Sequence, residues 1–372
     1  MNKQYFEAVA ILVGTIIGAG VLGIPYVVAQ SGIVIGLAHL ILLGVAVLFI
    51  NLYVAEISLR TKKKYQLVKY AEKYTGKVGK WLMTFAMVVG IYGALIAYII
   101  GEGQSLSALF GLDSTIAMLS FFVIMSILIY LGLNIIESWE LILGIIMLGI
   151  LMLIIFLSLP HAKFENLLNI NLHNLFLPYG VILFSFIGAM AIPEMKETLK
   201  HHKNKLKNAI ILGSLIPIVS YILFVIVSVA VTGINTEQIA TIGLGKAIGT
   251  HMILLGNLFA IFSMATSFLA LGLGLQWMYT YDFGLKKNLS FILTISLPLF
   301  VVLLNLTSFV QALSITGAIA GGIEGIVIVF MLHNARKKGE RKPEFTVKTN
   351  KVISTILATL FILGIIYTFV TL

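Results

Sequence analysis

The stretch GTIIGAGVLGIP, residues Gly14 to Pro25, lies inside an apolar run that extends from about residue 6 to residue 30. Glycine costs about 1 kcal/mol in a helix interior and proline about 3 kcal/mol, so this stretch weakens any helix that contains it. A second stretch, SFIGAMAIP at residues 185 to 193, repeats the pattern of small residues followed by Ile-Pro. The sequence therefore predicts two helices that are broken at corresponding places.

The whole chain has the composition of a membrane protein. Of its 372 residues, 59% are hydrophobic and 11% are charged, whereas a soluble protein is about 45–50% apolar and about 25% charged. The chain has no cysteine, which excludes disulfides, thiolate metal sites and a cysteine nucleophile. We therefore expect an all-α integral membrane protein without a large domain outside the bilayer.

Continuous apolar windows predict eleven transmembrane helices. A bilayer core about 30 Å thick takes roughly 20 apolar residues per helix, and the windows lack the alternation that barrel strands show. The ninth window is short and contains Pro298. The windows are residues 6 to 30, 33 to 57, 81 to 109, 115 to 134, 139 to 159, 175 to 195, 208 to 232, 247 to 272, 289 to 305, 311 to 332 and 352 to 371.

The basic residues predict the orientation in the cytoplasmic membrane. With the N-terminus in the cytoplasm and the C-terminus outside, only Lys163 and Lys246 of the 25 Lys and Arg residues lie on the outer side, as the positive-inside rule requires. The net charge of +10 then forms a rim that faces anionic lipid. We expect membrane lipid as a partner and no nucleic acid.

The inner segment 58 to 80 contains a short amphipathic pattern. Leu67, Tyr70, Ala71 and Tyr74 recur at helical spacing before Gly76, which predicts a helix with one apolar face. Such a helix either braces an inner gate or simply lies at the lipid headgroups.

The two broken spans indicate an internal repeat. They are the first and the sixth, and an odd number of five spans per unit places the second unit upside down in the membrane. We therefore predict a first five-helix repeat at residues 1–159 and an inverted second repeat at residues 160–334. Residues 335–372 then form a basic cytoplasmic loop and an eleventh helix.

A break at mid-membrane persists only where it lines a cavity or meets a ligand, because lipid cannot satisfy free peptide groups. The N–H groups that open the second half-helix suit a carboxylate, and the C=O groups that end the first suit an ammonium or a small cation. Together they describe a site for a zwitterion. The alternative is that Gly14-x-x-x-Gly18 is only a close-packing face between helices.

Three hydroxyls in the eighth span share one helix face. Ser263, Thr266 and Ser267 lie at i, i+3 and i+4, and hydroxyl and carbonyl oxygens form the hard shell that a small cation prefers. The alternative is that these hydroxyls bond to their own helix or join neighbouring spans.

Acidic residues inside membrane spans are costly and are therefore functional candidates. Glu324 lies deep in the tenth span between glycines, where it could handle a proton or coordinate a cation. Glu194 follows Pro193 and could hold a coupling proton or cap the second half-helix. Glu56 and Glu102 lie near the ends of their windows, so we expect them to reach the membrane interface.

These stretches resemble the signatures of secondary amino acid transporters in the amino acid/polyamine/organocation superfamily. The similarity is greatest to its amino acid/auxin permease and aromatic amino acid permease branches. Residues 14 to 25 are similar to the first span of those transporters, 185 to 194 to the sixth, 265 to 274 to the eighth, and 70 to 76 to the first inner loop.

The resemblance implies a five-plus-five inverted repeat with alternating access and a substrate site at the two breaks. It implies that the amides of Gly18, Ala19 and Gly20 receive the substrate carboxylate. The substrate amine would then be bound by backbone carbonyls, which are those of Ile16 and of Ser185 or Phe186.

The resemblance also bears on the coupling ion. In sodium-coupled relatives, the cation site would correspond to the carbonyls of Gly14 and Ile17 with the hydroxyls of Ser263, Thr266 and Ser267. Some proton-coupled relatives carry a lysine in the fifth span, which is absent here. The coupling ion therefore stays open between Na⁺ and H⁺, and no other cofactor is expected.

The sequence thus predicts a secondary active amino acid permease rather than an enzyme, since neither H-E-x-x-H nor G-x-S-x-G occurs. A passive channel or uniporter for small polar solutes is the alternative. The amino acid and the oligomeric state are left open.

Overall fold

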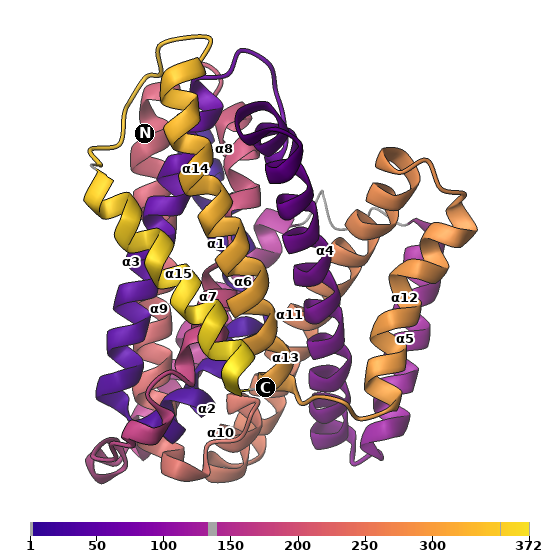
Figure 1. The fold of residues 1–372 in the computed structure, drawn as a ribbon. Helices are drawn as coiled ribbons and strands as arrows, with labels where there is room; N and C mark the ends of the chain where they lie inside the picture. The colour runs from indigo at the N-terminus through magenta and orange to yellow at the C-terminus, as the bar shows by residue number, and fades with distance from the viewer. Residues whose placement is uncertain (1–2, 133–139, 350, 372) are drawn as a thin grey trace.

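The computed structural model describes residues 3–132, 140–349 and 351–371, and it is helical throughout (Figure 1). In these ranges, one isolated bridge between Gly32 and Ile170 is the sole β-structure. The helices used below are α1 (Lys3–Ile16), α2 (Gly20–Ser31), α3 (Ile33–Leu59), α4 (Leu67–Phe110), α5 (Ser114–Leu131), α6 (Glu140–Ser158), α7 (Pro178–Phe186), η4 (Ala189–Ala191), α8 (Ile192–Thr198), α9 (Leu206–Thr232), α10 (Ala240–Ile248), α11 (Thr250–Trp277), α12 (Lys287–Leu303), α13 (Phe309–Thr316), the π-helical turn η8 (Gly317–Gly321), α14 (Gly322–Lys338) and α15 (Lys351–Thr371).

Nine helices in the described ranges are long and apolar enough to cross a membrane, and the bent pair α1 and α2 makes a tenth. The predicted window at 289 to 305 corresponds to α12, whose 17 residues are fewer than the roughly 20 that a crossing needs. Residues 135–138, which connect the predicted windows 115 to 134 and 139 to 159, lie outside the described residues, as do residues 133, 134 and 139 at the ends of those windows. The structure therefore supports a multi-pass membrane protein with nine to ten spans.

Both predicted helix breaks are present. The axes of α1 and α2 differ by 54°. The first turn of α2 is closed by hydrogen bonds between residues three apart, from Val21 N to Gly18 O and from Leu22 N to Ala19 O. In the other span, Ile187 leaves the helical region with a ψ of 121° and ends α7. Pro193 lies in the first turn of α8, where a proline needs no N–H partner.

Glycine 76 divides α4 into two parts because its φ of 73° suits no other residue well. The four apolar residues of the preceding amphipathic segment are all buried against the protein. Tyr74 also bonds to Thr61 through its hydroxyl and accepts a bond from Asn334 of α14 through its carbonyl. The predicted amphipathic helix is confirmed, and its apolar face packs against the neighbouring segments.

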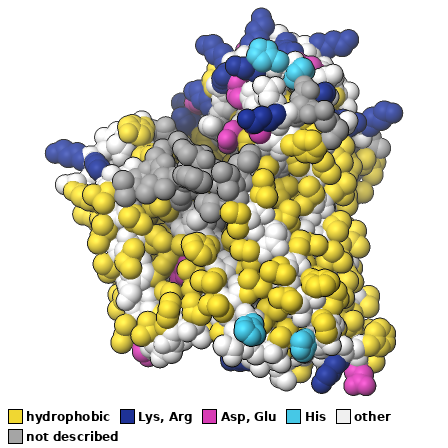
Figure 2. Space-filling view, turned by 180° about the vertical axis from the view of Figure 1, so that it is seen from behind, with side chains coloured by type: hydrophobic (Ala, Val, Ile, Leu, Met, Phe, Trp, Pro, Cys, Tyr) yellow, Lys and Arg dark blue, Asp and Glu magenta, His cyan; other side chains and the backbone are white. Residues whose placement is uncertain are grey.

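Lys and Arg side chains gather at the end of the molecule that holds the N-terminus (Figure 2). A buried ion network ties three chain segments together at this basic end. Glu56 of α3 has no exposed surface, and it accepts bonds from Arg60 at 3.0 Å, from Arg336 at 2.8 and 2.9 Å, and from Val347 N at 2.8 Å. Glu56 thus lies at the basic end but is enclosed by protein there, since the paired arginines offset the cost of burying its charge.

The segment after α14 is also anchored at the basic end. Glu340 forms an ion pair with Lys73 and accepts a bond from the Lys62 N–H, and the Lys73 ammonium holds the pKa of the Glu340 carboxyl below its usual value. The chain then continues into α15, which crosses α14 (Figure 1). Phe361 and Ile365 of α15 pack directly on Gly325 and Gly322.

Glu56→Gln is expected to destabilise the folded protein, because the amide leaves the buried side of Arg336 without its charge partner. The loss is on the order of 2 kcal/mol or more, and a falling melting temperature in detergent would report it. Glu7→Gln is the matched control, since the Lys3–Glu7 pair is exposed and spans 3.7 Å. Equal melting temperatures for the two variants would contradict the assignment.

Candidate functional site

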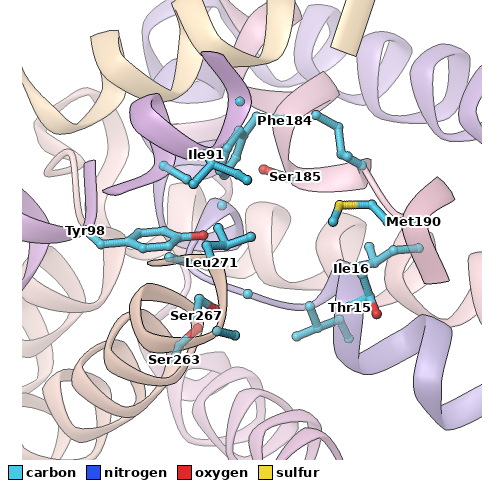
Figure 3. Close-up of a pocket in the computed structure, with 18 of the residues that line it drawn as sticks. Thr15, Ile16, Ile91, Tyr98, Phe184, Ser185, Met190, Ser263, Ser267 and Leu271 are labelled. Carbon is cyan, nitrogen blue, oxygen red and sulfur yellow. The ribbon is translucent and has the colours of Figure 1, made fainter. Parts of the chain in front are cut away.

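A cavity of about 240 Å³ lies where the two helix breaks meet (Figure 3). For comparison, a protein cavity of about 150 Å³ takes up benzene, so this one has room for a small organic molecule. Its walls come from the α1–α2 break, α4, α6, the α7–η4 break, α11, η8 and α14. The residues that line it and that matter below are Gly14, Ile16, Ile17, Gly18, Ala19, Gly20, Met87, Ile91, Ala94, Tyr98, Met147, Phe184, Ser185, Met190, Ser263, Thr266, Ser267, Leu271 and Glu324.

The two breaks are in direct contact at one glycine. A Cβ atom added to Gly20 would lie 2.9 Å from the Cα atom of Ser185, so only glycine fits. The N–H groups of Gly18, Ala19 and Gly20 donate to no acceptor in the described part of the chain. These amides open α2 at the cavity wall, where the positive end of the helix dipole favours a carboxylate.

Tyr221 of α9 contacts a backbone carbonyl at each of the two breaks. Its buried hydroxyl lies 2.7 Å from the Ile16 carbonyl oxygen and 3.1 Å from that of Ser185. The predicted amine-binding carbonyls are thus held together by one hydroxyl donor, and each keeps a second lone pair. Phe186 packs on the Tyr221 ring, with 5.2 Å between ring centroids, and its side chain does not line the cavity.

Sequence reasoning did not find Tyr221. The available signal was that it is the one tyrosine of the predicted seventh span, residues 208 to 232. A tyrosine hydroxyl that is buried in an apolar helix requires an acceptor. Nothing in the sequence indicated that the acceptors lie in two other helices.

The three predicted hydroxyls of α11 all face the cavity. The Ser263 oxygen is buried and has no partner among the described residues. Thr266 donates to the Phe262 carbonyl at 2.7 Å, which is the alternative that the sequence left open, although its oxygen keeps lone pairs for a cation. Ser267 lies beside Gly18 and is faced by the Tyr98 hydroxyl.

Gly14 and Ile17, whose backbone carbonyls are predicted cation ligands, also line the cavity. Gly14 packs against Gly144 of α6, because a Cβ added to Gly144 would lie 3.2 Å from the Gly14 Cα. The predicted cation ligands therefore line the same cavity, where α1 packs on α6. In the described residues, no group of three His, Asp or Glu side chains gathers as a metal site would require.

The predicted acids differ in their location. Glu324 lines the cavity and also a smaller pocket between α3, α7 and α15. Glu194 lies on an exposed face of α8 and is not part of the cavity wall. Glu102 has no exposed surface, so the expectation that it reaches the interface is wrong.

The rest of the wall is mostly apolar. Figure 3 shows Ile91, Tyr98, Phe184, Met190 and Leu271 around the open space. Small residues of α4 widen this part of the cavity, and they are Ala86, Gly90 and Ala94.

Comparison with known proteins identifies the chain. Residues 1–370 match the tryptophan/tyrosine permease family. The chain belongs to this family. It is therefore an amino acid permease of the membrane and not an enzyme.

Three curated bacterial relatives resemble the permease. Glutamine transporter 2 of Aliivibrio fischeri is 26% identical over 91% of each chain. Tyrosine-specific transport system 1 of Haemophilus influenzae is 27% identical over 92% of this chain and 91% of its own length. Tyrosine-specific transport system 2 of the same organism is 26% identical over 60% of this chain and 57% of its own.

Gly20→Ala is expected to lower amino acid uptake at least about tenfold. The added methyl group meets the Ser185 backbone, and overpacking of this kind costs about 1–3 kcal/mol, of which about 1.4 kcal/mol is a factor of ten. Uptake by cells that express equal amounts of folded variant measures the effect. Gly149→Ala is the control, because a Cβ there meets nothing within 4 Å; unchanged uptake by Gly20→Ala would refute the contact.

Tyr221→Phe is expected to weaken substrate binding about tenfold and to lower the melting temperature, since two buried carbonyls lose their donor at about 1–3 kcal/mol. Binding titration of the purified protein measures the first effect. Tyr92→Phe is the matched control: its hydroxyl bonds to Tyr279 and Leu293, and it does not line the cavity. If both variants bind like the unaltered protein, Tyr221 has no role at the breaks.

Proposed function

We propose that the protein is a secondary active transporter that carries an amino acid across the cytoplasmic membrane together with Na⁺ or H⁺, by alternating access. One observation carries the proposal. The cavity lies between two helix breaks. The N–H groups of Gly18, Ala19 and Gly20 have no acceptor in the described residues, and the Ile16 and Ser185 carbonyls each keep a second lone pair beside Tyr221, as a zwitterion stripped of water requires.

The α-carboxylate of the substrate binds to the amides of Gly18, Ala19 and Gly20, and its ammonium binds to the carbonyls of Ile16 and of Ser185 or Phe186. Because Tyr221 already donates to Ile16 and Ser185, the ammonium uses the second lone pair of each oxygen. The tyrosine thereby fixes the distance between the two acceptors before the substrate arrives.

The substrate side chain extends toward α4 and α11. Met87, Ile91, Met147, Phe184 and Leu271 line that part of the cavity, and burial of an apolar group there gains about 25 cal/mol per Å². A large apolar or aromatic side chain fits this wall best. The relatives named for tyrosine transport agree with this class, and the relative named for glutamine makes glutamine the comparison substrate.

The cation binds between α1 and α11. Its ligands are the carbonyls of Gly14 and Ile17 and the hydroxyls of Ser263, Thr266 and Ser267, if the ion is Na⁺. If the ion is H⁺, a carboxyl such as Glu324 or Glu194 carries it. Substrate and cation then both bridge the break in the first span, so that joint binding stabilises the occluded state.

We assign this conformation to the state that opens toward the basic end. Met190 of η4 lines the cavity and is 38% exposed. A Cβ at Gly23 would lie 3.1 Å from Leu313 and 3.5 Å from Phe309, so α2 and α13 pack closely together. Alternating access opens this contact and closes the other side.

The topology follows from the same proposal. The 17-residue α12 completes eleven spans, the N-terminus is cytoplasmic, and the C-terminus is outside. Residues 1–159 and 160–334 are inverted repeats that each begin with a broken helix, and 335–372 lie outside the repeat. This is the arrangement of the amino acid/polyamine/organocation superfamily, in the amino acid/auxin or aromatic amino acid permease branch.

Uptake into proteoliposomes tests the function. L-tyrosine, L-tryptophan and L-glutamine are supplied with an inward Na⁺ gradient, an inward H⁺ gradient, or neither. We expect saturable accumulation of at least one amino acid above its external concentration, and only with one of the gradients. Flux that merely equilibrates the two sides would show a uniporter or channel and would overturn the proposal.

A further inference from the structure

We propose that Glu102 of α4, rather than Glu324 or Glu194, is the proton-binding site of this protein, in a closed position behind the substrate cavity. That it binds a proton stands on geometry alone. That this proton is the coupling ion rests on the proposed transport function.

Glu102 is enclosed by apolar groups. The side chain has no exposed surface, and neither carboxyl oxygen has a hydrogen-bond partner among the described residues. Its carboxyl faces the backbone at Ala265 of α11. The adjacent Gly101 contacts Met264 and the Phe309 ring, and Gly103 contacts Met118 of α5.

No charge partner faces Glu102 from the elements packed around it. Within the described ranges, α13 and η8 carry no titratable side chain, α5 carries Tyr130 and α11 carries His251. Lys287 starts α12, and Asp113 precedes α5, where it is exposed and accepts backbone bonds from Thr115 and Ile116. Helix α14 carries Glu324, which lines the cavity. Its other titratable groups lie in its last turns at the basic end, and they are His333, Arg336, Lys337 and Lys338.

An isolated carboxylate in such a place would lack any compensation for its lost hydration. Burial of an uncompensated charge costs several kcal/mol even after relaxation, and membrane interiors increase that penalty. The carboxyl is therefore stable here only as the neutral acid. Loss of the proton requires that the contact between α4 and α11 changes.

Glu102 continues the stripe of α4 that faces the cavity. Ala94 and Tyr98 line the cavity, and Glu102 follows Tyr98 by four residues, which is about one helical turn. The Tyr98 hydroxyl faces Ser267 of the α11 hydroxyl group. A ligand that displaces Tyr98 or α11 thus alters the packing that keeps Glu102 neutral.

Buried polar groups without partners continue from Glu102 away from the basic end. Ser105 lies about one turn further along α4, and Asn257 lies about two turns before Ala265 in α11. The Asn257 side-chain oxygen has no partner in the described residues, whereas its amide nitrogen donates to the Ile253 carbonyl at 2.8 Å. Thr241 of α10 packs on Gly256, and its hydroxyl is also without a partner in the described structure. The proton enters along these groups from the side opposite the basic end, binds to the carboxylate, and leaves toward the cavity once α4 and α11 separate.

Infrared spectroscopy of the purified protein tests proton binding without transport. A pH titration of the unaltered protein should show the C=O band of a buried carboxylic acid near neutral pH, and Glu102→Gln should lack it. Glu237→Gln is the control, because that carboxylate is exposed and paired with Lys246. If the band persists in Glu102→Gln, or disappears in Glu324→Gln instead, Glu102 is not the site.

Transport separates coupling from binding. In proteoliposomes with a pH-sensitive dye inside, L-tyrosine, L-tryptophan or L-glutamine should acidify the interior with the unaltered protein. Glu102→Gln should exchange labelled amino acid at a similar rate but lose at least about nine-tenths of the acidification. Glu237→Gln should retain both.

The remaining outcomes are decisive as well. Acidification by Glu102→Gln at the unaltered rate, or uptake by the unaltered protein that needs Na⁺ and moves no proton, overturns the coupling role while the transporter assignment stands. If Glu102→Gln exchanges no amino acid, Glu102→Asp is measured instead, because it keeps a carboxyl group. Acidification by Glu102→Asp supports the coupling role of the carboxyl, and amino acid exchange without acidification refutes that role. If the unaltered protein moves none of the three amino acids, the proposed function fails, and the infrared result still decides proton binding.

Discussion

The structure depends on peptide groups that have no helical partner at mid-membrane. Lipid offers them no hydrogen bonds, so each break must be satisfied by protein or by cargo. Here the carbonyls of Ile16 and Ser185 are met by the Tyr221 hydroxyl, whereas the amides that open α2 have no acceptor in the described part of the chain. The cavity, the close approach of Gly20 and the polar wall of α11 all follow from this unequal arrangement.

Much of this could be predicted from the sequence because it depends on local backbone cost. Glycine and proline at residues 14 to 25 and 185 to 193 predicted both breaks, and helical spacing predicted that Ser263, Thr266 and Ser267 face one side. The buried face of the helix that ends at Gly76 followed from the same periodicity. Each of these inferences needs only neighbours within about two turns.

The failures concern partners that are distant in sequence. Glu56 is buried because Arg336 and Val347, almost 300 positions later, reach it. Glu102 was expected at the interface since its window ends at about residue 109, yet α5, α11 and α13 close over it. Tyr221 gained its importance from two acceptors on other helices. In all three cases the environment of the side chain is set by tertiary packing, which a local sequence pattern does not reveal.

The packing of α15 on α14 depends on two glycines, which have no side chain to keep the helices apart. Gly322 and Gly325 leave a furrow along α14, and Phe361 and Ile365 fill it. A chain shortened before Lys351 would present that furrow to acyl tails, which fit a narrow trough of backbone poorly. The final helix therefore covers α14 on one flank of the molecule and keeps lipid out of the furrow.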